Sequence, residues 1–182
     1  MAGIQISPCE LAGTFLVQAY MAEDARGSFV KMQQRSWFAA CGLDADFRES
    51  YFSVSHARVI RGMHFQSPPY DHAKLVTVVQ GKIVDVVLDL RRSSPTYGRH
   101  CAVELSAADG QSLYVGRGLA HGFAVLEGEA TVNYMVTTEY APDHDMGVRY
   151  DSFGYCWPMT NPILSDRDRA LPPLARLATP FS

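Results

Sequence analysis

The sequence predicts a mainly β protein, an antiparallel sandwich or barrel with short helices at its periphery. Two observations support this fold class. Short apolar segments recur along the second half of the chain, and turns containing glycine or proline separate them about every 8–12 residues. A chain of 182 residues is enough for one domain with a sizeable core and hardly enough for two. We therefore expect a single domain over residues 1–182.

The first half of the chain contains few clear elements. Residues 15–17 (FLV) can form a short strand, and residues 24–28, which are polar and include a glycine, indicate a loop or turn. Residues 35–42 (RSWFAACG) are the best candidate for a short helix, with Gly42 as its stop signal. Residues 51–55 alternate as a strand does.

Strand signals become regular from residue 74 onward. Residues 74–79 and 83–90 are typical of two strands, and the tight turn between them predicts a hairpin. The further predicted strands cover residues 100–105, 112–115, 122–126 and 130–138, with a loop at 91–97 and a turn at 107–110.

The tail from Trp157 onward is rich in proline. Residues 165–170 can form a helical turn, which Pro172 and Pro173 end. We expect this tail to pack along the outside of the barrel.

Composition excludes several classes of protein. The net charge of -3 gives no electrostatic case for binding nucleic acid, and no apolar run approaches membrane-spanning length. Residues 1–11 lack the pattern of a signal peptide. The cysteines are far apart, so we expect reduced, buried thiols and a cytoplasmic protein. They are Cys9, Cys41, Cys101 and Cys156.

Polar side chains interrupt the apolar rows on the predicted inward faces of the strands. Any one of them is more often structural than functional. Several on neighbouring strands of one barrel favour a ligand pocket at its mouth. The interrupting residues are Lys74, Asp85, Asp89 and Tyr134, and His64 shares its side of another segment with Gln66.

A metal site is not expected. Small β-barrels that bind metal often use a His-x-His pair, but the residue two positions after His64 is Gln66. The other histidines are scattered without short ligand spacing, and His121 has no near partner in the sequence.

Without a metal, these residue types indicate proton transfer. A histidine is a natural base near neutral pH, above all when a carboxylate fixes its tautomer. A lysine can stabilise negative charge that develops on an oxygen, and a tyrosine can deliver a proton from the opposite side. Epimerisation next to a carbonyl needs a base, an acid and an enolate stabiliser.

The chain resembles the dTDP-4-dehydrorhamnose 3,5-epimerase family of cupin-type jelly-roll proteins. The resemblance spans nearly the whole chain in order. The similar segments are DARGSF (24–29), VIRGMHFQ (59–66), KLVTVVQGKIVDVVLDLRRSSPTYG (74–98), VELSAADGQSLYV (103–115), GLAHGFAVL (118–126), TTEYAP (137–142) and LSDRD (164–168).

The resemblance implies a cofactor-independent epimerase of a nucleotide-linked 4-keto-6-deoxy sugar that works as a homodimer. It implies that His64 is the base, that Asp168 is its carboxylate partner and that Tyr134 is the acid. It also implies that Lys74 lies near the C4 ketone, with Asp85 beside it.

The resemblance further implies a set of substrate-binding residues. Arg61 and Arg26 match positions that contact the nucleotide diphosphate, Arg26 by reaching across from a partner subunit. The remaining binding positions are Phe29, Lys31, Glu49, His121 in the sugar pocket and Tyr140 near the nucleobase.

The sequence departs from the family pattern on the nucleotide side. Lys31 stands where glutamate is common, and Glu49, Tyr51 and Phe52 replace glutamine, asparagine and histidine. A lysine cannot accept a hydrogen bond from a thymine N–H. A nucleotide other than dTDP, such as GDP or CDP, is therefore an alternative.

The sequence does not fix the exact reaction. The enzyme could invert carbon 3 only, carbon 5 only, or both. It could also be a keto-isomerase or dehydratase that uses the same histidine, or a sugar-binding barrel without activity.

Overall fold

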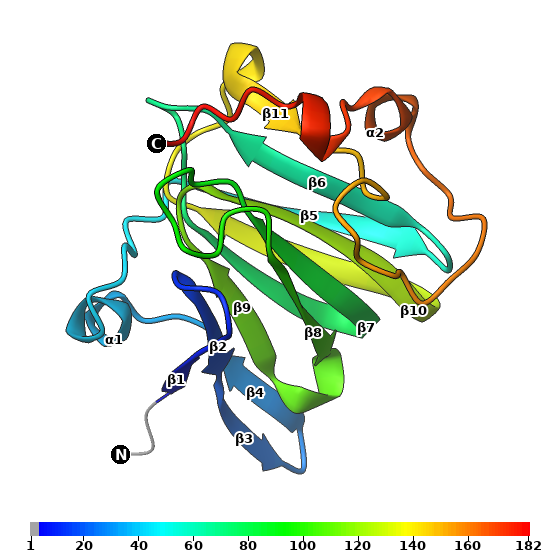
Figure 1. The fold of residues 1–182 in the computed structure, drawn as a ribbon. Coiled ribbons are helices and arrows are strands. Elements are labelled where there is room, and N and C mark those ends of the chain that lie inside the picture. Colours follow the sequence, from blue (N-terminus) through cyan, green and yellow to red (C-terminus); the bar gives the residue numbers. More distant parts are fainter. Residues whose placement is uncertain (1–3) are drawn as a thin grey trace.

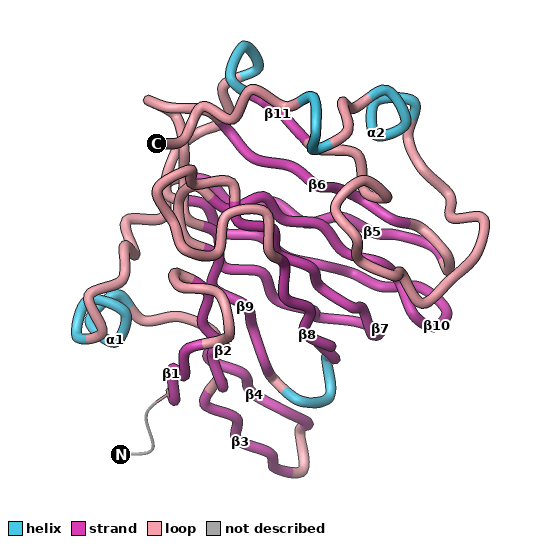
Figure 2. The backbone as a smooth tube through the Cα atoms, in the orientation of Figure 1, coloured by secondary structure: helices cyan, strands magenta, loops and turns pink. Residues whose placement is uncertain are grey.

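The computed structural model describes residues 4–182 (Figure 1). Strands dominate it, and the helices are short and peripheral (Figure 2), as the sequence predicts. The strands are β1 (Gln5–Pro8), β2 (Thr14–Gln18), β3 (Tyr20–Asp24), β4 (Gly27–Lys31), β5 (Glu49–His56), β6 (Ile60–Gln66), β7 (Lys74–Asp89), β8 (His100–Ser106), β9 (Gln111–Val115), β10 (Leu119–Val136) and β11 (Asp145–Gly147). The helices are α1 (Arg35–Ala40) and α2 (Asp166–Ala170), with 3-10 turns η1 (Ala107–Asp109), η2 (Pro142–His144) and η3 (Leu174–Arg176).

The long strands β7 and β10 form a ribbon on which the other strands assemble. They pair antiparallel from Asp89 opposite Leu119 to Lys74 opposite Val136. Strands β9 and β5 flank the half that begins at Lys74, and β8 and β6 flank the other half. The sheet, in the order β1-β2-β9-β7-β10-β6-β11, therefore bends into two layers around an apolar core (Figure 1).

The predicted hairpin at residues 74–90 is wrong, and so is the predicted break between residues 126 and 130. Each region is one continuous strand. Gly81 has φ +79°, and a Cβ there would overlap the carbonyl oxygen of Glu129 on the neighbouring strand. The pairing of β10 with β7 also shifts register between residues 125 and 132. Gly81, and Gly128 with φ +58°, therefore mark bulges within long strands rather than turns between short ones.

The other predicted strands and the predicted helix at residues 35–42 are confirmed as β2, β5, β8, β9 and α1. The polar stretch 24–28 contains the predicted turn. The strands that it joins, β3 and β4, were not predicted. They form a separate two-stranded sheet that projects from the body (Figure 1).

The C-terminal tail packs along the outside of the sheet, as predicted. The ring of Phe181 lies 5.5 Å from that of Phe65, between centroids, and is buried. Burying a phenylalanine side chain contributes roughly 1.5–3 kcal/mol. The predicted helical turn is α2, and the Ser165 hydroxyl caps it by accepting from the N–H of Asp168 at 3.0 Å.

The four cysteines are free thiols, but only Cys101 is fully buried, and Cys41 and Cys156 are exposed. The expectation of buried thiols is therefore only partly correct. Of the segment 1–11, which lacks a signal-peptide pattern, residues 1–3 lie outside the described residues. Within residues 4–182, no helix has the length and apolar character needed to cross a membrane.

Asp89, one of the inward-facing acids, has a structural role. Its buried carboxylate accepts from the backbone N–H and the guanidinium of Arg91, and from the hydroxyls of Ser94 and Thr96, at 2.6–3.0 Å. Burial raises the pKa of Asp89, but these hydrogen bonds outweigh burial and lower it to about 2. The carboxylate therefore anchors the loop after β7, and its stabilisation is complete above the ordinary pKa of 3.8 and is lost as the pH falls below that value and through about 2.

We expect Asp89→Ala to lower the free energy of unfolding at pH 7 by about 3 kcal/mol, because Arg91 and two hydroxyls lose a buried partner. Urea denaturation measures this loss. The control Asp109→Ala removes an exposed carboxylate and should change the value by less than about 0.5 kcal/mol. Equal losses in the two variants would contradict the structural role.

Candidate functional site

A cavity of about 440 Å³ lies against β5, β6, β7 and β10. Its wall combines histidines, a lysine, arginines and tyrosines with few apolar side chains. The sequence-predicted residues that line it are Glu49, Arg61, His64, Lys74, His121, Tyr134 and Tyr140.

His64 lies on β6 at the cavity wall, and Asp168 of α2 contacts it from the buried side. The Nε2 atom of His64 is 2.6 Å from Oδ1 of Asp168, and the two side chains are 27% and 4% exposed. The N–H of Gly62 donates to the other carboxylate oxygen at 3.4 Å. Gly62 has φ +133°, and a Cβ there would overlap the Cα of Gly122 on β10. Glycine at this point lets β6 approach β10 closely beside the His64–Asp168 pair.

Burial and pairing set the protonation of these two groups. Burial lowers the pKa of His64 below its ordinary value of 6.5, although the hydrogen bond and charge of Asp168 partly oppose this. Burial raises the pKa of Asp168, but the hydrogen bond and charge of His64 outweigh it and hold that pKa below 3.8. At neutral pH the acid is therefore ionised and the imidazole neutral. The ionised carboxylate can only accept, so Nε2 carries the proton and Nδ1 carries the lone pair.

Lys74 places a cation beside His64. It begins β7, its side chain is buried, and its Nζ atom donates to the carbonyl oxygen of His64 at 3.5 Å. Burial lowers the pKa of Lys74 to about 8, although the charges of Asp145 and Asp85 raise it. The positive charge of Arg167 adds to the lowering.

Asp85 and His121 form a second buried pair, in which His121 lines the cavity and Asp85 lies behind it. His121 Nε2 lies 2.8 Å from Oδ2 of Asp85, and His121 is the register partner of His64 across β6 and β10. Burial raises the pKa of Asp85, and the nearby His121 and Lys74 oppose that rise. Tyr134 is also buried, and burial, together with the charge of Asp85, holds its pKa far above the ordinary value. Its hydroxyl therefore stays protonated and can donate.

Backbone and side-chain contacts fix the rim of the cavity. The Arg61 guanidinium donates to the Ser55 hydroxyl at 2.9 Å, and Glu49 accepts from the backbone N–H of Tyr140 at 2.6 Å. Gln66, which is buried, accepts from the N–H of Ala141 at 2.7 Å. Its amide also donates to the carbonyl oxygens of Tyr70 and Glu139 and contacts His72 Nδ1.

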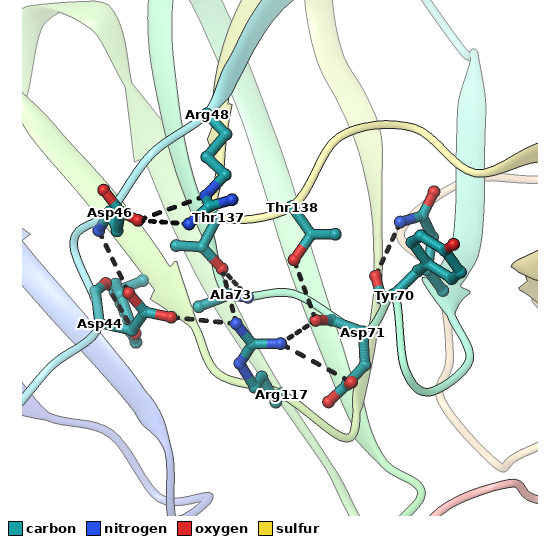
Figure 3. Close-up of polar contacts among 11 residues, drawn as sticks. Asp44, Asp46, Arg48, Tyr70, Asp71, Ala73, Arg117, Thr137 and Thr138 are labelled. Atoms are coloured by element: carbon teal, nitrogen blue, oxygen red, sulfur yellow. Dashed lines mark hydrogen bonds and ion pairs between the residues drawn. The ribbon is translucent and has the colours of Figure 1, made fainter.

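A polar network centred on Arg117 supports the same rim (Figure 3). The guanidinium contacts the carbonyl of Asp71, the carboxylate of Asp44 at 3.1 Å and the hydroxyl of Thr137 at 3.4 Å. Thr137 in turn accepts from the N–H of Ala73 at 3.0 Å. The network ties the segment before Lys74 to the end of β10, and so holds two walls of the cavity together.

Three predicted binding residues lie outside the cavity of their own chain. Arg26, Phe29 and Lys31 belong to the projecting hairpin of β3 and β4. Arg26 pairs with Asp24, Phe29 is 59% exposed, and Lys31 donates to Gln34 at 3.0 Å. None of the three lines the cavity of its own chain.

Several cavity residues were not predicted from the sequence. They include His72, Asp145 and Arg167, and also Tyr51 and Gln66, which were noted in the sequence without a role of their own. Alternation could have indicated His72, which lies two positions before Lys74. Asp145 and Arg167, which pair at 2.7 Å, come from segments without periodic patterns. Among residues 4–182, no three or more His, Cys, Asp or Glu side chains gather as metal ligands would.

Comparison with known proteins identifies the family. The sequence profile of the dTDP-4-dehydrorhamnose 3,5-epimerase family matches residues 8–176. The chain belongs to this family. This confirms the predicted mainly β jelly-roll fold and the predicted function, a deoxysugar epimerase, which is an isomerase. A keto-isomerase, a dehydratase and a sugar-binding barrel without activity are not favoured.

Individual members of the dTDP-4-dehydrorhamnose 3,5-epimerase family agree with this assignment. The enzyme of that name from Mycolicibacterium smegmatis is 39% identical over 91% of this chain and 83% of its own. A crystal structure of the Bacillus anthracis enzyme with TDP and pyrophosphate bound has a TM-score of 0.90 and 37% identity, covering 94% of this chain and 99% of its own. ChmJ, a 3'-monoepimerase from Streptomyces bikiniensis in complex with dTDP-quinovose, has a TM-score of 0.87 and 32% identity, over 93% and 87%.

The lowered pKa of Lys74 can be measured directly. In protein labelled with ¹³C at lysine Cε, we expect Lys74 to titrate at about pH 8, because burial disfavours its charge. Lys82, whose pKa is raised by its hydrogen bond with Glu104, should titrate above 10.5. A Lys74→Arg variant assigns the signal. A Lys74 signal that titrates at or above 10.5 would contradict the burial argument.

Proposed function

We propose that this protein epimerises a dTDP-linked 4-keto-6-deoxy sugar by removing a proton next to the ketone and returning one to the opposite face. The observation that carries the proposal is the neutral His64, paired at 2.6 Å with buried Asp168, beside the Lys74 cation in one cavity. Those relatives that were crystallised with TDP or dTDP-quinovose favour dTDP over GDP and CDP.

In this mechanism His64 is the base. It takes the proton from the carbon next to the ketone, and the C–H electron pair moves to the ketone oxygen to form an enolate. The Lys74 ammonium stabilises the enolate oxygen. The Tyr134 hydroxyl donates a proton to the opposite face and restores the ketone. The His64 imidazolium then releases its proton to solvent, and the tyrosinate takes one from solvent, which restores both groups. Each inversion is redox-neutral and needs no cofactor.

The protonation states set the working pH range. His64 must be neutral and Lys74 charged, so activity requires a pH above the lowered pKa of His64 and below about 8. Asp168 keeps the His64 proton on Nε2 and stabilises the imidazolium that forms. His121, oriented by Asp85 at 2.8 Å, supplies a further polar group for the sugar.

The rim residues suit the nucleotide part of the substrate. Arg61 offers a cation for the diphosphate, and Glu49 and Tyr140 offer a carboxylate and an exposed ring near the base. We propose that the protein works as a homodimer in which Arg26, Phe29 and Lys31 of one subunit reach the cavity of the other. The exposed position of their projecting hairpin supports this arrangement. Free thiols are consistent with a cytoplasmic location.

The test is proton NMR in deuterated water with dTDP-, CDP- and GDP-4-keto-6-deoxy sugars. We expect deuterium at carbon 3 and carbon 5 of the dTDP sugar, and slower labelling of the other two. Label at carbon 3 alone would make the protein a monoepimerase, as ChmJ is named. No label in any of the three sugars would overturn the proposal.

Two histidine variants test the role of the base. His64→Gln should lower the labelling rate by about 10²–10⁴-fold, because the positioned general base is lost. His56→Gln, on the exposed surface of β5, is the matched control and should keep the parent rate. An active His64→Gln variant would remove His64 from the mechanism.

A further inference from the structure

Tyr51 stacks on Tyr134. The two residues are register partners on β5 and β10, their ring centroids lie 4.9 Å apart and their planes differ by 21°. Stacked aromatic pairs attract beyond the contribution of their buried area, and cross-strand neighbours are close enough to couple their rotamers. One face of the Tyr134 ring is therefore covered by Tyr51.

A second contact limits the Tyr134 ring from another direction. The His121 imidazole meets it edge to face, with centroids 6.0 Å apart and planes at 78°. The His121 imidazole is not free to move with the Tyr134 ring, because its Nε2 is held 2.8 Å from the buried carboxylate of Asp85. Tyr134 is thus confined between a fixed imidazole and the Tyr51 ring.

Tyr51 is the more exposed member of the stack. It lines the cavity and is 43% exposed, whereas Tyr134 is 7% exposed. Strand β5 pairs with β10 through its whole length, so the backbone of Tyr51 is fixed although its side chain faces the cavity. A substitution that removes only the ring of Tyr51 would leave the β-sheet pairing in place and free one face of Tyr134.

From these contacts we propose that Tyr51 is a positioning residue, which holds the hydroxyl of Tyr134 on the face of the sugar opposite His64. The proposal rests on the proposed function, in which Tyr134 returns the proton. Tyr51 itself transfers no proton. Its effect is to raise the fraction of enolate that is protonated by Tyr134 rather than by His64.

This role has a signature that general destabilisation lacks. After His64 removes a proton, the imidazolium exchanges with solvent and can return a deuteron to the original face, which gives labelled substrate of unchanged configuration. Delivery by Tyr134 to the other face gives inverted product. When Tyr134 is displaced, the enolate still forms, but a larger fraction of it returns to labelled substrate of unchanged configuration and a smaller fraction becomes inverted product.

The experiment measures the ratio of retained to inverted label at the reacting carbon in deuterated water, for the full-length protein with the dTDP-4-keto-6-deoxy sugar. Both outcomes arise from the same folded enzyme, so the ratio does not depend on how much of a variant folds. We expect Tyr51→Leu to raise the ratio about 2- to 12-fold, the range that corresponds to loss of an aromatic pair. Tyr51→Phe, which keeps the ring, should match the parent.

Phe52→Leu is the matched control. Phe52 is the next aromatic residue on β5. The family pattern puts this position on the nucleotide side, but Phe52 is 68% exposed and does not line the cavity. The Phe52→Leu variant should leave the ratio of retained to inverted label unchanged. A parent-like ratio in Tyr51→Leu, or an equal rise in Phe52→Leu, would overturn the positioning role of Tyr51 and leave the proposed function standing. A parent protein that incorporates no label would overturn the proposed function, and this proposal with it.

Discussion

The antiparallel pairing of β7 with β10 is the constraint on which the rest of the structure depends. The two strands run side by side from Asp89 and Leu119 to Lys74 and Val136. Each contributes to both layers, because different strands flank its two halves. Alternation along this ribbon places one cation on β7 and one phenol on β10 toward the same cavity. Strand β6 joins the ribbon beside His121 and brings His64 to the same wall. The fold thus brings the side chains of Lys74, Tyr134 and His64, from three strands, to one cavity without a long loop.

Electrostatics then give each of these groups a different protonation state near neutral pH. Two buried carboxylates each face a histidine, yet their pKa values move in opposite directions. Burial dominates at Asp85, while at Asp168 the paired imidazole and the Gly62 N–H outweigh burial. Burial also lowers the pKa values of His64 and Lys74 and raises that of Tyr134. A neutral base, a nearby cation and a protonated phenol therefore coexist near neutral pH, which is the combination that enolate chemistry requires.

The sequence predicted the strand-borne part of the site because side-chain alternation is local. Lys74, Asp85 and Tyr134 interrupt apolar rows, and all three are buried in or behind the cavity wall. Family resemblance, not periodicity, indicated Asp168, which lies far from His64 in the sequence. The hairpin at residues 74–90 was wrong because a glycine at positive φ suits a bulge as well as a turn. The stacking of Tyr51 on Tyr134 and the place of Arg167 in the cavity were missed, because both depend on contacts between distant segments.

The protonation of His64 is the most direct test of the proposed chemistry. ¹⁵N NMR of histidine-labelled protein reports both the pKa and the tautomer of each imidazole, and a His64→Gln variant assigns the signal. We expect a pKa below 6.5 and a neutral form with the proton on Nε2, donated to Asp168. A pKa at or above 6.5, or a proton on Nδ1, would contradict the claim that the Asp168 pair presents a neutral base to the cavity.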